Sequence, residues 1–291
     1  MKQREFCIVG LGLLGGSYAI ALTNAGCRVT AVDVRAEALD YARGQGWIAE
    51  GALPEQAEAL LGRAEVIVLG LYPQDVVPWV QQFQPFFQPG VLLTDVCGVK
   101  RAVVERVQDV LRPDAELIAC HPMAGKEVSG VEYADCAIFR PANFLITPTE
   151  KNSAEAIAFA HELGRTLGFR RITELSCARH DEMIGYVSQL THAIAVALMN
   201  ANDDPELPLT TGDSFRDLTR IAKINDKLWS ELFLENSDLL IQEIDRFSAE
   251  LGKLRTALEQ EDKDALCTMF RASTARRKLF DRTEAEKTRE N

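Results

Sequence analysis

The sequence predicts an α/β fold, a doubly wound and mostly parallel sheet followed by a C-terminal all-helical domain. Three observations predict it. A glycine-rich turn, GLGLLGGS from Gly10, stands between an apolar strand and a helix. Apolar runs of strand length then alternate with stretches of helical spacing, which is typical of a parallel sheet. After about residue 174 the strand signals cease. We therefore expect one domain at 1–174 and a second at 175–291.

The bulk composition excludes several classes of function. A chain of 291 residues is long enough for two domains. Its formal net charge of -11 argues against nucleic acid or an anionic membrane as a partner. Seven cysteines without a Cys-x-x-Cys pair favour reduced thiols in the cytoplasm and suggest no metal site. The charged start predicts no signal peptide, and no apolar run is long enough to span a bilayer.

The glycine-rich turn has the context of a dinucleotide-binding Rossmann fingerprint. It follows an expected strand at 6–10 and precedes an expected helix at 18–24. Asp33 closes the next expected strand, 28–32, at the distance that this fingerprint requires. The glycines allow a tight turn and bring a pyrophosphate to the amino terminus of the helix. A glycine-rich turn without a ligand is the alternative.

Asp33 favours NAD over NADP. A carboxylate at the end of the second strand accepts hydrogen bonds from the ribose hydroxyls and repels a 2′-phosphate. The nearby Arg35 keeps NADP as an alternative. The residues expected to bind the cofactor are Gly10, Gly12, Leu13, Leu14, Gly15, Asp33, Tyr72, Asp95 and Gly98.

Three further expected strands end at residues with functional side chains. Tyr72 follows the strand at 65–69, Asp95 follows the strand at 91–94, and His121 follows the strand that ends at 119. Parallel strands end at one edge of a sheet, so these side chains should converge with the glycine-rich turn. Helical spacing separates the strands at 36–45, 54–61 and 99–111.

His121 is the best-placed histidine of four. Pro122 has no amide hydrogen and ends the strand, which puts His121 at its carboxyl end. Gly125 and Gly130 then keep the following loop compact. A neutral histidine, with an ordinary pKa of about 6.5, suits a general base. A histidine that only caps a strand is the alternative.

The C-terminal part is expected to be helical after two last strands. These strands lie at 143–147 and 170–173, on either side of a helix at 154–167. The expected helices of the second domain lie at 177–200, 214–224, 227–259 and 262–280.

The helical part carries two groups of polar residues. Ser188 and His192 share a helix face, and a buried histidine satisfied within a bundle is the alternative. Arg220 stands between apolar neighbours in an acidic chain, which indicates that it binds an anion. Arg216 is expected to pair with neighbouring aspartates instead. His161 and His180 have no evident partners in the sequence, and both are interpreted as structural.

Five motifs resemble the prephenate and arogenate dehydrogenases. They are GLGLLGGS from Gly10, HPMAGKEVSG from His121, the pair His180-Asp181, SQLTHAIA from Ser188 and SFRDLTRIAKINDKLW from Ser214. The resemblance covers nearly the whole chain. It implies a Rossmann domain followed by a helical domain that forms a homodimer. The implied reaction is the NAD-dependent oxidative decarboxylation of prephenate to 4-hydroxyphenylpyruvate in tyrosine biosynthesis.

The same resemblance implies roles for single residues. His121 matches the catalytic histidine, while Arg220 and His192 match the groups that hold the substrate. Trp229 resembles a tryptophan that lines the pocket entrance from the partner chain. The residues expected to bind substrate are Arg220, His192, Ser188, Gln189, Lys126 and Trp229.

Two positions depart from the family pattern. Gly98 stands where the family has a serine that contacts the catalytic histidine, and we expect a gap there that a water fills. Gln189 stands where the family has the first histidine of a His-x-x-His pair.

Three further functions stay open beside prephenate oxidation. Arogenate could be the substrate, because it differs from prephenate only in an amino group. A hydroxyacid dehydrogenase would share the fold but would use a lysine base. An NAD-binding sensor without chemistry would keep the cofactor edge and account for the changes at Gly98 and Gln189.

Overall fold

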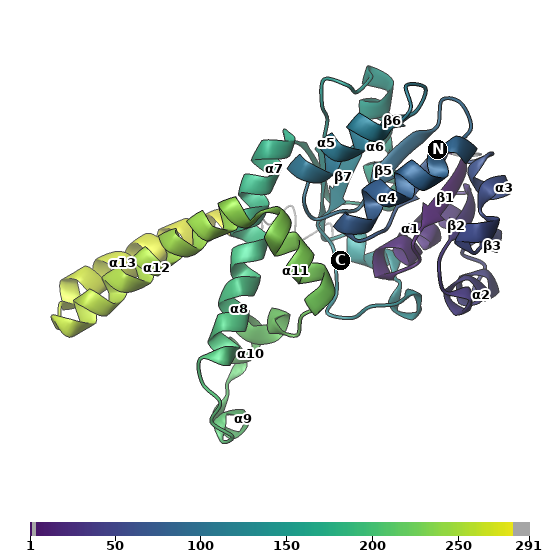
Figure 1. The fold of residues 1–291 in the computed structure, drawn as a ribbon. Helices are drawn as coiled ribbons and strands as arrows, with labels where there is room; N and C mark the ends of the chain where they lie inside the picture. The colour runs from purple at the N-terminus through teal and green to yellow at the C-terminus, as the bar shows by residue number, and fades with distance from the viewer. Residues whose placement is uncertain (2–3, 282–291) are drawn as a thin grey trace. The chain divides into compact units, whose positions relative to one another are not determined.

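The computed structural model describes residues 1 and 4–281 (Figure 1). Contacts within the chain divide it into two compact units, Met1–Leu240 and Ile241–Asn291. The first unit contains both sheets, and the second contains most of helix α12 and all of α13. The domain boundary predicted at residue 174 lies inside the first unit and stays a prediction.

The larger sheet has six parallel strands in the order β3-β2-β1-β4-β5-β6. The order reverses between β1 and β4, which is where doubly wound folds bind dinucleotides. A smaller sheet has the order β7-β8-β9. The predicted doubly wound, mostly parallel fold is therefore confirmed. The strands are β1 (Glu5–Val9), β2 (Arg28–Val32), β3 (Glu50–Ala52), β4 (Val66–Leu69), β5 (Leu92–Asp95), β6 (Glu116–Leu117), β7 (Ala119–Pro122), β8 (Asn143–Thr147) and β9 (Arg171–Glu174).

Helices connect the strands and continue after the last of them. The α-helices of the sheet region are α1 (Leu13–Asn24), α2 (Ala36–Gly44), α3 (Glu58–Leu61), α4 (Pro73–Phe83), α5 (Arg101–Val110) and α6 (Ala154–Leu167). Those that follow are α7 (Cys177–Ile184), α8 (Leu190–Asn200), α9 (Leu207–Thr210), α10 (Asp213–Thr219), α11 (Asp226–Glu235), α12 (Ser237–Glu259) and α13 (Lys263–Arg277). The short 3₁₀ turns are Pro54–Gln56, Gln84–Phe86, Val131–Tyr133, Cys136–Phe139, Arg220–Ala222 and Lys278–Phe280.

Strand β1 shows why the apolar runs read as central strands. Alternate side chains of a strand point to opposite faces. Phe6 and Ile8 join a core cluster with residues of α1, α2 and α6. Cys7 and Val9 join a second cluster with residues of α3, α4 and α5. Helices therefore cover both faces of the sheet, and α4 and α5 lie side by side on one of them (Figure 1).

The segment that contains His121 passes from one sheet to the other. β6 pairs with β5 in the larger sheet, and the amide of Ile118 still bonds to the β5 backbone. After Ile118 the chain pairs antiparallel with β8 as strand β7. His121 is the last residue but one of β7, followed by Pro122. The predicted place of His121 at the carboxyl end of a strand is confirmed.

Two of the predicted helices are less regular than expected. The helix predicted at 177–200 contains a π-helical turn, Gly185–Gln189, between α7 and α8. The helix predicted at 214–224 ends at Thr219, where the short 3₁₀ turn begins.

A third predicted helix, 227–259, is divided at Asn236. This residue is fully buried, and its backbone leaves the helical region with φ -129° and ψ 24°. Its side-chain amide donates to the carbonyl oxygen of Asp181 at 3.0 Å and to Oε1 of Gln189 at 2.8 Å. These contacts with α7 and the π turn fix the break between α11 and α12. Among the described residues, no helix is long and apolar enough to cross a membrane.

Candidate active site

The carboxyl edge of the larger sheet carries the glycine-rich turn. Gly10 has a φ of +92°, and a Cβ there would lie 2.5 Å from the carbonyl oxygen of Gly70. A Cβ at Gly15 would lie 2.0 Å from the carbonyl oxygen of Gly10. The fold itself therefore requires glycine at both positions. A Cβ at Gly12 would meet nothing within 4 Å, so packing within the protein does not explain Gly12.

The amino terminus of α1 is free to receive an anion. Gly12 is its N-cap residue, and no side chain caps the helix or puts a negative charge in its first turn. Leu13 and Leu14 begin that turn. Unpaired amides and the helix dipole make such a terminus suitable for phosphate. The residues present fit the pyrophosphate of a dinucleotide.

Asp33 lies at the end of β2, beside this turn. Its Oδ2 accepts a hydrogen bond from the Leu11 amide at 2.6 Å, and its Oδ1 accepts one from the Arg35 amide at 2.8 Å. The guanidinium Nε of Arg35 lies 3.8 Å from the carboxylate. The ionised group keeps further lone pairs for hydroxyl donors.

The sequence predicted that Asp95 contacts the cofactor, but its side chain is buried and is used within the protein. Its carboxylate is 2% exposed and pairs with Lys100, which is fully buried. It also accepts the amides of Cys97 and Cys120, each at 3.0 Å. Burial works against the charge on Lys100, but Asp95 more than offsets this and holds the pKa of Lys100 above its ordinary value. Asp95 thus holds together the backbone after β5 and the backbone of β7 through buried hydrogen bonds.

Helix α11 lies against the same edge. The side-chain amide of Asn225, its N-cap residue, donates to the Tyr72 hydroxyl at 3.3 Å. The Lys227 ammonium lies 4.6 Å from the centre of the Tyr72 ring. Glu231 accepts a hydrogen bond at 3.2 Å from the amide of Gln74, in the first turn of α4. Residues after the sheet domain therefore help to enclose the expected cofactor edge.

His121 is joined to His180 and Asp181, a pair that the resemblance included but whose contact with His121 the sequence did not predict. Its Nδ1 lies 2.9 Å from Nε2 of His180. Nδ1 of His180 lies 2.7 Å from Oδ1 of Asp181. His180 was predicted to be structural and without convergent partners, and this contact corrects that interpretation. His161, by comparison, pairs with Glu174 away from this group.

Both histidines of this group have pKa values below the ordinary value of a histidine, which favours their neutral forms. Burial, followed by the neighbouring His180 and Lys100, holds the pKa of His121 well below its ordinary value of 6.5. Burial also lowers the pKa of His180, although the bond to Asp181 opposes this. Burial disfavours the charged form of Asp181, but hydrogen bonds from His180 and from backbone amides hold its pKa below the ordinary value.

Gly98 lies beside His121, and Leu232 narrows the gap that was expected there. A Cβ at Gly98 would lie 3.9 Å from Cε1 of His121 and 3.1 Å from Cδ2 of Leu232. Leu232 of α11 is buried and occupies the space next to the glycine. Leu232 therefore takes up part of the space that was expected to be open, and the bridging water stays a prediction.

Gln189 serves the packing of helices in this structure. It is 1% exposed, and its amide donates to the carbonyl oxygen of Leu232 at 2.7 Å. Its Oε1 accepts the bond from Asn236. The substrate contact predicted for Gln189 is therefore corrected, because both ends of its carboxamide are used within the protein.

Arg220 already holds a carboxylate. Its guanidinium pairs with Glu127, which lies on the loop after His121. Arg220 is 63% exposed, whereas Glu127 is 32% exposed. The predicted anion-binding character of Arg220 thus agrees with an observed contact. Arg216 pairs with Asp213 at 2.6 Å, as expected.

His192 and Trp229 lie next to this ion pair. Their rings stack with centroids 3.5 Å apart, within one chain. Nδ1 of His192 donates to the carbonyl oxygen of Ser188 at 2.9 Å. Ser188 therefore orients the ring of His192 through its backbone. Burial, with a contribution from Arg220, lowers the pKa of His192.

Lys126 lies on the loop after His121 and is 43% exposed. Its ammonium is 3.3 Å from Asp135, and the adjacent Glu127 pairs with Arg220, so the substrate contact predicted for Lys126 stays a prediction. Within residues 1 and 4–281, no cluster of histidine, cysteine and acidic side chains is suited to hold a metal ion.

Comparison with known proteins gives this chain a family. Residues 18–173 match the family described as "Prephenate dehydrogenase, nucleotide-binding domain", and residues 176–272 match "Prephenate dehydrogenase, dimerization domain". The cyclohexadienyl dehydrogenase of Zymomonas mobilis is 30% identical over 285 residues, which is 93% of this chain and 94% of that protein. The prephenate dehydrogenase of Bacillus subtilis is 28% identical over 277 residues, or 91% of this chain and 73% of that protein.

A solved structure has the same architecture. The prephenate dehydrogenase of A. aeolicus, crystallised with hydroxyphenyl propionate and NAD+, aligns with a TM-score of 0.88 and 26% identity. The alignment covers 97% of this chain and 99% of that one. The two matching families together span most of the sequence, and the fold agrees along its length. This chain belongs to the prephenate dehydrogenase family.

Proposed function

We propose that this protein is an NAD-dependent prephenate dehydrogenase, with arogenate as the alternative substrate. The observation that carries the proposal is the placement of His121 on β7, the strand that follows β6 of the dinucleotide-type sheet, where a second histidine holds it. Relatives named prephenate dehydrogenase and cyclohexadienyl dehydrogenase support the reaction class without separating the two substrates.

The cofactor edge supports NAD. Gly12 leaves open space beside the uncapped start of α1, where a pyrophosphate fits. Asp33 offers a carboxylate to the ribose hydroxyls and repels a 2′-phosphate. Arg35 is half exposed and only 3.8 Å from Asp33, so it offsets part of that repulsion. We therefore expect NAD to be preferred over NADP rather than used alone.

His121 supplies the base. The hydroxyl on C4 of prephenate must lose its proton as the hydride leaves that carbon. NAD, when bound, accepts the hydride. Nε2 of His121 accepts the proton, while the contact of its Nδ1 with His180 holds the ring in place. Loss of carbon dioxide then makes the product ring aromatic, which drives the reaction to completion.

Arg220 is proposed to bind a carboxylate of the substrate. In the structure its guanidinium is paired with Glu127, so a carboxylate is the group that this position accepts. A substrate carboxylate would replace that of Glu127 in a charged hydrogen bond. His192 and Trp229 would then border the ring, since their stacked rings lie beside the ion pair.

The function is tested by measuring NADH formation with prephenate and with arogenate. We expect turnover with prephenate, and a higher kcat/KM with NAD than with NADP. A clear preference for arogenate would mean that arogenate is the substrate, and the proposed reaction chemistry would stay the same. Binding of NAD without NADH formation from either compound would favour the sensor and refute the proposed reaction.

All seven cysteines have free thiols. Unpaired thiols suit a reducing compartment. This supports the cytoplasm as the proposed location.

We further propose that the chain forms a homodimer through α12. Large apolar side chains recur along this helix at heptad spacing, at Ile244, Phe247, Leu251, Leu254 and Leu258. Most of these side chains are exposed, up to 65% for Leu258. A seam of this kind is stable when a second helix covers it.

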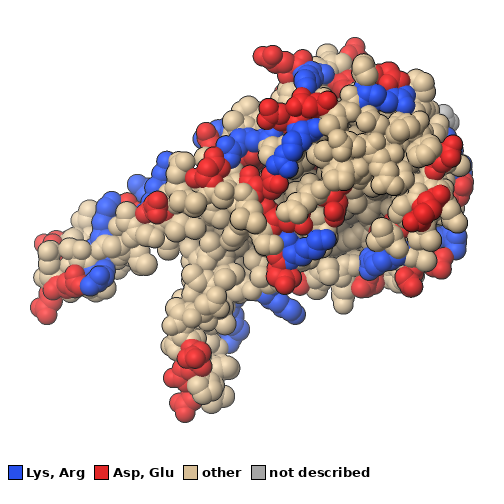
Figure 2. Space-filling view, viewed as in Figure 1, with Lys and Arg blue, Asp and Glu red and all other residues tan. Residues whose placement is uncertain are grey.

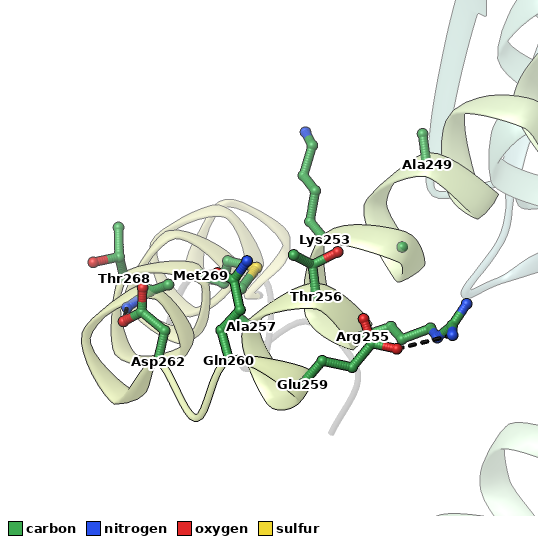
Figure 3. A pocket seen from close by; sticks show the side chains of 12 residues that line it. Ala249, Lys253, Arg255, Thr256, Ala257, Glu259, Gln260, Asp262, Thr268 and Met269 are labelled. Atoms are coloured by element: carbon green, nitrogen blue, oxygen red, sulfur yellow. Dashed lines mark hydrogen bonds and ion pairs between the residues drawn. The ribbon is translucent and has the colours of Figure 1, made fainter.

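Two other surfaces suit the same partner. An open pocket of about 740 Å³ lies between α12 and α13, with small side chains such as Ala249 and Ala257 in its lining (Figure 3). Arg255 and Glu259 form an ion pair at its rim at 2.8 Å. In the first unit, few charged side chains cover α8 on the face shown in Figure 2. Leu198 and Met199 are exposed at the end of that helix.

Light scattering at micromolar concentration tests the dimer. We expect twice the mass of the chain for the native protein. Leu251→Glu puts a charge into the seam and should give monomers. Gln242→Glu adds the same charge on the opposite side of α12 and should leave the dimer intact. A native monomer would refute the proposal, and so would equal behaviour of the two variants.

A further inference from the structure

We propose that His180 and Asp181 are positioning residues that fix the ring of His121 with its Nε2 unprotonated. The inference deepens the proposed function and rests on His121 as the base. Three side chains form one chain of hydrogen bonds, with 2.9 Å between the two imidazoles and 2.7 Å between His180 and the carboxylate. His180 is fully buried and Asp181 nearly so.

The direction of these hydrogen bonds follows from the last member. An ionised carboxylate only accepts, so Nδ1 of His180 must carry the hydrogen that it donates to Asp181. In a neutral imidazole the other nitrogen is then an acceptor, so Nε2 of His180 accepts from Nδ1 of His121. This leaves Nε2 of His121 with a free lone pair. No described residue hydrogen-bonds that nitrogen, so it is available to a substrate hydroxyl.

Asp181 is itself held by the start of α5. Its Oδ1 accepts the amide of Lys100 and its Oδ2 accepts the amide of Arg101, both at 2.9 Å. No side chain close in sequence caps α5, so Asp181 supplies that cap from another helix. The positive end of the helix dipole also stabilises the carboxylate. The carboxylate of Asp181, which is the last acceptor in this series of hydrogen bonds, is therefore fixed in orientation and does not take up a proton easily.

The same arrangement assists the proton transfer. When the substrate O–H bond breaks and a new N–H bond forms at Nε2, His121 becomes positively charged. The charge is stabilised through His180 by the negative Asp181. The buried ammonium of Lys100 acts in the opposite sense, because it lowers the pKa of His121 and favours the neutral form. The proton stays on Nε2 until solvent removes it, and His180 and Asp181 keep their charges throughout.

The alternative is that His180 and Asp181 only satisfy one another inside the protein. Two substitutions separate these roles. His180→Gln keeps an oxygen that accepts from Nδ1 of His121, whereas His180→Leu keeps the bulk and removes the acceptor. We expect His180→Leu to lower kcat by about 10²- to 10³-fold with KM values for substrate and NAD unchanged. We expect His180→Gln to restore kcat to within about tenfold of the native value.

The His121→Asn background gives the sharper comparison. A residue that acts through His121 has nothing left to position once the imidazole is gone, so His180→Leu should cost no further activity there. A structural role predicts the same loss in both backgrounds. Equal losses, or native turnover in His180→Leu alone, would overturn the proposal.

A spectroscopic measurement separates this inference from the proposed function, because it needs no substrate. The chain has four histidines, so ¹⁵N NMR of the ring nitrogens is tractable. We expect His121 in the native protein to be protonated at Nδ1 and bare at Nε2, and to become a mixture of tautomers in His180→Leu. The opposite tautomer in the native protein would refute the inference, whatever the enzyme turns over.

Discussion

His121→Asn is expected to fold and to bind NAD, but to turn over about 10²- to 10⁴-fold more slowly than the native enzyme, the usual contribution of a positioned base. The asparagine amide can still donate to His180, so the buried pair behind it keeps its partner. What is lost is the lone pair at Nε2. Stopped-flow measurement of NADH formation, with NAD binding followed by fluorescence, separates the two effects. A variant with near-native turnover would mean that the proton leaves by another route.

The pH dependence of the native enzyme gives the control. The base works in its neutral form, which exists above its pKa. Burial, with His180 and Lys100, holds that pKa well below 6.5, so kcat/KM should stay high until the pH falls below the range of an ordinary histidine. This fall of kcat/KM at acid pH should be absent in His121→Asn. An acid limb at or above the ordinary value would contradict the structure.

Arg220→Gln is expected to raise KM for the substrate by about 10- to 150-fold, which corresponds to the roughly 1.5 to 3 kcal/mol of a lost charged hydrogen bond. The substitution removes the charge and leaves Glu127 without its partner. Because Arg220 is exposed, the fold and NAD binding should not change. Steady-state kinetics with varied substrate at saturating NAD would measure this.

Arg216→Gln is the matched control. Arg216 lies one turn earlier, is 60% exposed and is paired with Asp213. Its substitution therefore removes the same charge from the same region. Its KM should stay close to native. If both variants raise KM equally, general electrostatics explains the effect. An unchanged KM in Arg220→Gln would give Arg220 a structural role.

The sequence predicted that Asp33 lies beside the glycine-rich turn, where its carboxylate accepts the amide of Leu11. Gly10, Asp33 and His121 each follow an apolar run, and parallel strands must end at one edge. It did not predict that the strand before His121 leaves the larger sheet at Ile118 and joins a second one. This change from one sheet to the other determines which side chains surround His121, and no local pattern in the sequence predicts it.

Contacts between helices were hidden for a similar reason. His180 lies 59 residues from its partner His121, and the pair His180-Asp181 was noted only as one motif of the resemblance. Leu232 narrows the space beside Gly98 from a helix far along the chain. Asn236 interrupts a strongly helical stretch because its side chain is used by α7 and the π turn. Helix propensity is local and does not register such bonds.

The π turn at Gly185–Gln189 lies within the helix that carries His180 before it and His192 after it. Each residue of an α-helix turns the chain by about 100°, and a π turn accommodates an additional residue within one turn. Deleting one residue there would restore regular winding and leave His192 in nearly the same phase relative to His180, because the π turn absorbs the additional residue. The additional residue therefore supplies one more side chain to the contacts of this turn, such as those of Gln189 with Leu232 and Asn236, while His180 and His192 keep their alignment along the helix.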